Sequence, residues 1–283
     1  MNQIKSLKSI MAIFLFLALM GNSLAAQSAS SSSQKNKEDS FKALTVQPTV
    51  ESILTSYVED YRNDQFAKNP MLFGVEVKDH GSWTIHITGK QVKDGWEVIL
   101  KEGMPQSPTF LYVVEYATLV GVYEEKLNAI TAQVKAFSSD YAPMDTKFME
   151  GYEPSQEEVD KINPFSFHFW TKGFPEKVPF GSGLTREAHG ADAVLFYYQK
   201  GFRGGWLRIQ PKAKVRHDPR EQAMPFPMLV IALKGVTEGE MNGERVSLSE
   251  GNALFIPAGT VHKWWNETEE ASESILIMFG EGA

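Results

Sequence analysis

The chain lacks cysteine altogether, although it has 283 residues. This absence excludes disulfide bonds, thiol chemistry and cysteine-based zinc fingers, and it leaves no cysteine to carry a lipid anchor. Basic clusters are also lacking. The net charge is −7 and lysine and arginine occur only as scattered pairs, which argues against a nucleic-acid partner. The residue spacings of nucleophile-elbow hydrolases, zinc metalloproteases, P-loop nucleotidases and dinucleotide-binding enzymes are missing as well.

The N-terminus has the layout of a secretory signal peptide. Lys5 and Lys8 precede the apolar run Ile10 to Met20, and small residues follow up to Ala26. Because a membrane-spanning helix needs about 20 apolar residues, this run favours cleavage over anchoring. We therefore expect residues 1–26 to be removed and the rest of the chain to be exported without a membrane span. The bacterial periplasm is the expected destination, and secretion is the alternative.

The next segments predict a tether and an α+β domain. Residues 27–45 are polar and rich in serine, which is typical of a disordered tether. In residues 46–163 helical and strand-like apolar periodicities follow one another, so we expect helices packed on a small antiparallel sheet. The expected elements are a helix over 49–66 capped by Thr49, a meander of strands near 83–87, 96–100 and 110–114, a helix over 117–138, and a short helix over 155–162 opened by a Ser155–Glu158 capping box.

The order of these elements and the segments GSWTIHITGK, GWEVIL and PTFLYVVE resemble the sterol carrier protein family of lipid-binding domains. The resemblance rests on pattern over about 100 residues of the domain and has no diagnostic motif. It implies an apolar tunnel between sheet and helices that takes a fatty acyl or sterol-like ligand. The alternative is that the aromatic residues form an ordinary core.

A linker is expected over residues 164–190, which are rich in aromatic residues and punctuated by glycine and proline. His168 stands there between Phe167 and Phe169. A histidine among aromatic residues is more often a packing residue than a ligand, so we expect His168 to be part of the core.

The remaining residues, 191–283, predict an all-β domain. Short strand-like runs follow one another without a helix-length apolar period, which is typical of a sandwich or barrel. Gly204-Gly205 and Asn242-Gly243 read as turns between strands. The expected strands are at 193–198, 206–209, 228–233, 245–248, 253–256, 261–265 and 275–279.

The most specific signal is the segment from Gly251 to Asn266, with the pattern G-x5-P-x-G-x2-H-x3-N. Strand alternation places His262, Trp264 and Asn266 on one face. The five fixed positions of this pattern resemble the second motif of the cupin superfamily at every fixed residue. The resemblance implies a jelly-roll β-barrel in which His262 points inward.

The region of the first cupin motif departs from the family pattern. That motif normally supplies two histidines and a glutamate to a metal site, but this chain has one histidine there, His217, with either Val215 in place of the first histidine or Pro219 in place of the second. Met228 stands where a glutamate is expected, and Glu221 follows His217 at an accepted spacing. His217, Glu221 and His262 would form a set of two imidazoles and one carboxylate, which suits Fe, Mn or Zn, and the family also holds Ni or Cu. Because residues i and i+4 of a straight strand lie about 13 Å apart, Pro219 would have to bend the chain.

Two functions therefore stay open. The first is a binding protein that holds a small molecule, lipid-like or otherwise, in its barrel, and the eroded first motif favours it. The second is a metal-dependent enzyme of the dioxygenase, isomerase or lyase type, because the fold hosts all three. The expected pocket residues are Trp206, Phe255, Trp264 and Asn266, and a homodimer through sheet edges is a family-level expectation.

Overall fold

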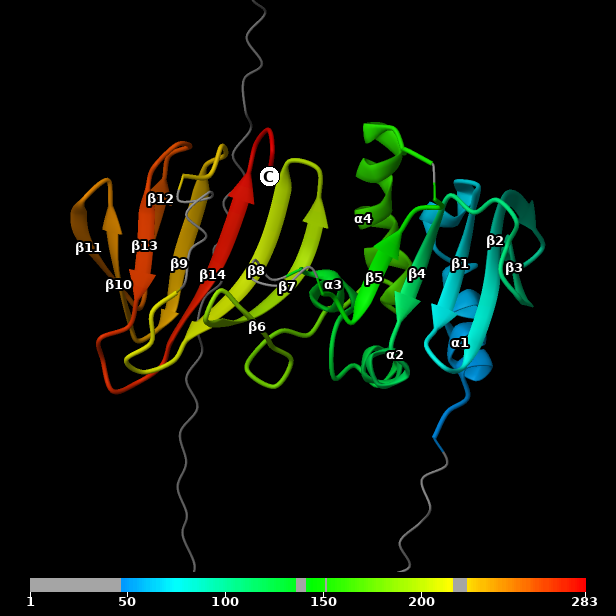
Figure 1. Cartoon of the computed structure of the whole chain (residues 1–283), viewed down its shortest axis with the longest axis horizontal. Coiled ribbons are helices and arrows are strands. Elements are labelled where there is room, and N and C mark those ends of the chain that lie inside the picture. The colour runs from blue at the N-terminus through cyan, green and yellow to red at the C-terminus, as the bar shows by residue number, and fades with distance from the viewer. Residues whose placement is uncertain (1–46, 136–140, 151, 216–222) are drawn as a thin grey trace, which may run out of the picture. The chain divides into compact units, whose positions relative to one another are not determined.

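The computed structural model describes residues 47–135, 141–150, 152–215 and 223–283, and all elements below belong to these ranges (Figure 1). The predicted signal peptide and tether lie outside the described residues. Within the described ranges, no helix is both long enough and apolar enough to cross a membrane.

Helix α1 (Val50–Tyr61) begins where the sequence predicts. The Thr49 side chain accepts a hydrogen bond from a backbone N–H of the first turn, 3.1 Å away, and so caps the helix. The helix is shorter than the predicted span, because the chain turns at Arg62 and continues as a 3-10 turn, η1 (Gln65–Lys68). Its buried face carries the residues that give the helical period: Ile53, Leu54, Tyr57, Val58 and Tyr61.

The N-terminal sheet has five strands in the order β3-β2-β1-β4-β5. The three predicted strands exist, but the predicted meander is wrong, because β1 lies between β2 and β4 and pairs with β4 in parallel. The β1 strand escaped prediction because Gly74 and Glu76 interrupt its apolar run. Gly74 is needed there, since a Cβ would lie 2.6 Å from the Leu111 and Met104 side chains. The strands are β1 (Met71–Val77), β2 (Gly81–Val92), β3 (Gly95–Glu102), β4 (Phe110–Val114) and β5 (Met144–Lys147).

Two short helices, α2 (Tyr116–Tyr123) and α3 (Ala129–Gln133), replace the single helix predicted over 117–138. The helical conformation ends after α2 because Glu125 adopts a left-handed backbone conformation, with φ of 57°. Asn128 then starts α3 as its N-cap, and its side chain accepts a hydrogen bond from the backbone N–H of Thr131 (2.7 Å).

Helix α4 (Gln156–Trp170) confirms the predicted capping box between Ser155 and Glu158. It runs on through Pro164, so the first residues of the predicted linker are helical. The extension is stabilised by burial of aromatic side chains, since Phe165 and Phe169 are both at most 5% exposed.

The core of this half is a cluster of aromatic rings between α1, α4 and the sheet. Tyr61 of α1 contacts Phe165 and Phe169 of α4, and Phe73 of β1 contacts the same two rings at 5.1 Å. A pocket of about 30 Å³ lies beside this cluster, near Tyr57. It has room for a water molecule or two and is far smaller than an acyl chain.

The C-terminal half forms two sheets, of six strands in the order β12-β9-β14-β8-β7-β6 and of three in the order β11-β10-β13 (Figure 1). Every predicted strand is present, and β6 and β10 are additions. Buried residues of both sheets, among them Val230 and Leu248, share one core with Trp264. The strands are β6 (Arg186–Ala188), β7 (Ala191–Gln199), β8 (Phe202–Ile209), β9 (Met228–Lys234), β10 (Val236–Met241), β11 (Glu244–Ser249), β12 (Ala253–Ile256), β13 (His262–Trp265) and β14 (Ser272–Phe279).

Among the described residues these sheets are not closed into the expected barrel. In the described part of the chain beside β13, two isolated bridges join Lys214 to Trp265 and Ala223 to Val261.

The two predicted glycine turns have different outcomes. Asn242 and Gly243 form the turn between β10 and β11, with φ of 50° and 89°. Gly204 and Gly205 lie inside β8, so that turn prediction is wrong. Glycine is required at 204 because a Cβ would lie 2.5 Å from the ring of Phe196 on the neighbouring strand.

The two halves belong to one compact unit, Val46–Ala283, and are joined by hydrogen bonds between α3 and the β6–β7 hairpin. The Thr131 hydroxyl donates to the carbonyl of Leu195 (3.0 Å) and accepts from its N–H (2.9 Å). Arg186 donates to the carbonyls of Thr131 (3.0 Å) and Val134 (2.6 Å) at the end of α3. Thr131 thus satisfies both backbone groups of Leu195 at a bulge in β7.

Candidate functional site

The corner between β12 and β13 sets up the C-terminal candidate site. After Ile256 the chain turns through Pro257 and Gly259, and Gly259 has a left-handed φ of 76° that favours glycine. The N–H of Gly259 donates to the carbonyl of Met224 (2.8 Å), which fixes the corner. His262 follows this turn as the first residue of β13.

His262 is buried, with 4% of its surface exposed. Its Nδ1 lies 3.0 Å from the carbonyl of Thr260. When Nδ1 carries the proton and donates to this carbonyl, Nε2 holds the lone pair, which is how proteins orient a histidine for a ligand. Trp264 lies on the same face of β13, with its ring 6.5 Å from the imidazole, whereas Lys263 faces away and pairs with Glu240. The predicted alternation along this strand is confirmed.

Asn266 is 1% exposed, and its side chain holds the turn after β13. Its amide N–H groups donate to the carbonyls of Ile209 (3.1 Å) and Glu270 (2.7 Å). Its Oδ1 accepts from the backbone N–H (2.9 Å) and the hydroxyl (2.8 Å) of Thr268. Both ends of the amide are therefore engaged in structure.

The other predicted pocket residues lie apart. Trp206 is 2% exposed and sits on β8 of the six-stranded sheet, opposite Val194 and Ile275 on its neighbours. Phe255 on β12 is 56% exposed, with its ring 6.3 Å from that of Phe279. Of the predicted pocket set, β13 thus brings Trp264 together with His262, and Phe255 lies on the surface.

The predicted metal ligands His217 and Glu221 lie outside the described residues. The described ends of their segment bridge to β13 and to the residue before it, from Lys214 to Trp265 and from Ala223 to Val261. The N–H of Val215 also donates to the carbonyl of Trp264 (3.0 Å). The chain on either side of these two residues therefore lies next to the strand that carries His262.

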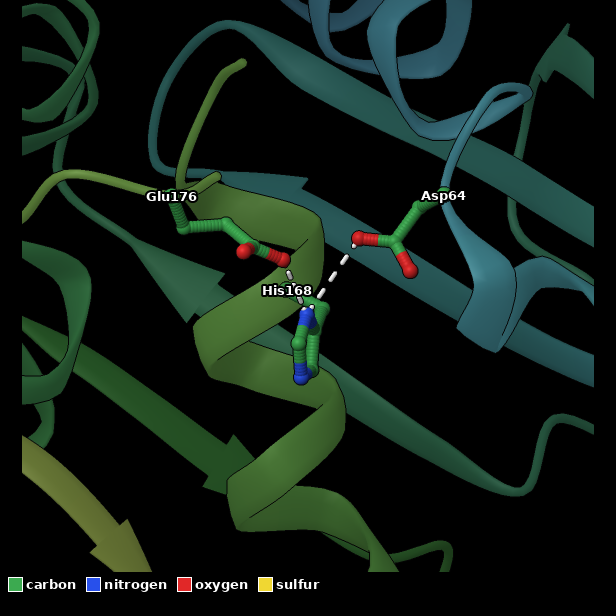
Figure 2. A group of neighbouring side chains, drawn as sticks. All are labelled: Asp64, His168 and Glu176. Atoms are coloured by element: carbon green, nitrogen blue, oxygen red, sulfur yellow. Dashed lines mark hydrogen bonds and ion pairs between the residues drawn. The ribbon is translucent and has the colours of Figure 1, made fainter. Parts of the chain in front are cut away.

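A second group of chemistry-bearing residues lies in the N-terminal half. Asp64 follows α1, His168 is on α4, and Glu176 comes after that helix, and both carboxylates reach toward the imidazole in Figure 2. Nδ1 of His168 lies 2.5 Å from a Glu176 oxygen and 3.3 Å from an Asp64 oxygen. Phe66 stacks on the imidazole with ring centroids 3.6 Å apart.

Burial and hydrogen bonding have opposite effects on the pKa values of His168 and Asp64. Burial alone would lower the pKa of His168, but hydrogen bonds to Asp64 and Glu176 raise it above the usual value for histidine. Burial would raise the pKa of Asp64, but hydrogen bonds from His168 and from the Phe66 N–H hold it below the usual value.

The sequence predicted only a packing role for His168. The stack with Phe66 confirms that part, but the two carboxylate contacts were missed. Asp64 is far from His168 in the chain, and no spacing motif joins them. The available signal was a histidine with a predicted packing role and an acidic residue, Glu176, eight positions further along the chain.

The comparisons place residues 207–278 against the family model described as Cupin domain. No curated protein matches the chain. The chain is similar to a Cupin 2 conserved barrel domain protein from Salinispora arenicola, with 19% identity over 38% of this chain and 91% of that one, and a TM-score of 0.34. It is similar to an RmlC-like cupin family protein from Methanocaldococcus jannaschii, with 14% identity over 38% and 94% of the chains and a TM-score of 0.32.

A sugar phosphate isomerase of the cupin superfamily from Silicibacter pomeroyi is similar at 16% identity, over 32% of this chain and 60% of that one, with a TM-score of 0.28. At these identities the likeness concerns the fold alone, and the family model carries the assignment. The resemblance of residues 46–163 to sterol carrier proteins is not shown by these comparisons.

Proposed function

Because residues 207–278 form a cupin domain, we propose that the protein binds a small organic molecule at the face of β13 that carries His262 and Trp264. The observation that carries the proposal is the burial of His262 beside an aromatic ring, on the strand that the second cupin motif opens. Pockets for small molecules combine apolar walls with a few placed polar groups, and this pair supplies one of each.

The same face supports a metal site formed by His217, Glu221 and His262. The described ends of the segment that carries His217 and Glu221 bridge to Trp265 and Val261, on either side of His262. Two imidazoles and one carboxylate suit Fe(II), Mn(II) or Zn(II), with positions left open for a ligand oxygen. A metal held there would polarise an oxygen atom of the bound molecule.

A second candidate function is catalysis by that metal, as a dioxygenase, isomerase or lyase. The orientation of His262 favours it, because the Thr260 carbonyl leaves Nε2 as the ligand atom when Nδ1 is protonated. The first cupin motif lacks one of its two histidines and has Met228 where a glutamate is expected. This favours binding without catalysis, so binding is the function we put first. We also propose export, on the signal-peptide layout of residues 1–26.

Metal content tests the metal part. The full chain would be produced without a histidine tag or chelator, and Fe, Mn, Zn, Ni and Cu would be measured in the wild type and in His262→Ala. We expect His262→Ala to lose one equivalent of metal, and the control His86→Ala, whose side chain is exposed on β2, to lose no metal. A folded His262→Ala protein with unchanged metal would contradict the site.

Native mass spectrometry tests the binding part. We expect a small molecule to copurify with the wild type and to be lost in Trp264→Ala, because the ring lines the proposed site. Trp265→Ala is the matched control, since that side chain faces the other side of β13. An equal amount of bound molecule in both variants, or none in the wild type, would overturn the proposal.

A further inference from the structure

We propose that Asp64, His168 and Glu176 form a binding site for a divalent transition-metal ion, independent of the cupin domain and of His262. Each residue offers one ligand atom, and the three atoms lie within 4.8 Å of one another. Ligands held about 2.1 Å from one ion lie about 3 Å from each other. The 3.3 Å separation between Nδ1 of His168 and the Asp64 oxygen is close to that spacing, and the 2.5 Å hydrogen bond between Nδ1 and Glu176 would lengthen when an ion replaces its proton.

The charges of the group suit a divalent ion. Asp64 and Glu176 are only 12% and 13% exposed, so two carboxylates stand largely out of water. Among the described residues, His168 is the cationic partner found within ion-pair distance of either carboxylate. An imidazolium balances one negative charge, whereas a divalent ion on a neutral imidazole balances both.

The ligands are held in place by their neighbours. Oδ1 of Asp64 accepts the N–H of Phe66 (2.7 Å), which turns Oδ2 toward the imidazole. The stacked ring of Phe66 fixes the plane of His168 from one side. Such outer contacts set the orientation of metal ligands in advance and so reduce the cost of ordering them on binding.

The donor set selects the kind of ion. One imidazole nitrogen and two carboxylate oxygens suit Zn(II), Mn(II) or Fe(II) better than Ca(II) or Mg(II), which prefer oxygen alone. Three protein ligands leave a position for water. A bound ion would fix Glu176, and with it the segment after α4, to the first helix and its turn.

Titration calorimetry with Zn(II) and Mn(II) chloride tests the site in the full chain, untagged and in the His262→Ala background. We expect His262→Ala to bind one equivalent of metal, and His262→Ala with Glu176→Gln to bind at least about tenfold more weakly. Glu157→Gln on the exposed start of α4 is the matched control and should leave binding unchanged. Asp64→Asn serves as a second ligand variant, and near-ultraviolet circular dichroism checks that each protein is folded.

The outcomes separate this site from the cupin site. Metal retained by His262→Ala and lost with Glu176→Gln supports the N-terminal site, whatever happens at His262. Equal binding by His262→Ala with and without Glu176→Gln overturns it. A wild type that binds one equivalent and a folded His262→Ala that binds none also overturns it, and leaves the cupin site standing.

Discussion

The hydroxyl groups of Tyr112 on β4 and Ser166 on α4 lie 2.5 Å apart inside the N-terminal core. Both residues are fully buried, and burial raises the pKa of Tyr112 well above its usual value. This contact satisfies a phenol that would otherwise be costly to bury, and it ties the parallel strand of the sheet to the helix above it.

Ser166→Ala is therefore expected to lower the free energy of unfolding by about 1 to 3 kcal/mol, because it removes a partner of the Tyr112 hydroxyl. Urea denaturation measures the change. Tyr112→Phe in the same background should recover part of the loss, since the unpaired group is then gone. A double mutant no more stable than Ser166→Ala would contradict this explanation of the contact.

Asn266→Ala should destabilise the C-terminal half by about 2 kcal/mol, since it removes the amide that donates to the Ile209 carbonyl in a buried contact and that accepts from Thr268 in the turn after β13. Asn252→Ala is the matched control, because its amide is exposed and bonds only within its own turn, so we expect less than about 1 kcal/mol. Chemical denaturation of the two variants gives the comparison. Similar losses in the two variants would mean that Asn266 has no special structural role in this chain.

Local patterns predicted most of the elements. The capping box at Ser155, the caps at Thr49, the strand alternation at His262 and the Asn242-Gly243 turn depend on neighbours a few residues away. Such features are encoded within one turn or one strand, so a single sequence reveals them. The cupin motif is of the same kind, because its glycines, proline and histidine belong to one corner.

Long-range pairing could not be predicted in the same way. Gly74 weakens the strand-like apolar pattern of β1 in the sequence. In the fold it lets the Leu111 side chain approach from β4, which is remote in the chain. Gly204 is typical of a turn in the sequence, but in the fold it lies in β8, where the ring of Phe196 on the neighbouring strand leaves no room for a side chain. The neighbours of His168 likewise come from separate parts of the chain, so its ion-pair contacts with Asp64 appear only in the fold.

Glu115 gives a prediction on pH. A hydrogen bond from the Tyr141 hydroxyl, and then one from Lys78, hold the pKa of this carboxyl below its usual value. A group whose pKa is lowered on folding stabilises the protein above its unfolded pKa, and this contribution disappears as the pH falls through the folded pKa. The stabilisation should therefore be complete at pH 7 and be lost below about pH 4.

Glu115→Gln isolates this contribution. Because the Glu115 side chain is 39% exposed, solvent screening limits its effect at pH 7 to no more than about 1 kcal/mol. Urea denaturation of the wild type and Glu115→Gln at pH 7 and pH 3 should show a gap in the free energy of unfolding that narrows at the lower pH. Tyr141→Phe should reproduce most of that gap, since it removes the largest cause of the lowered pKa. A gap of the same size at pH 7 and pH 3 would show that Glu115 acts through packing around the start of α2 and not through its charge.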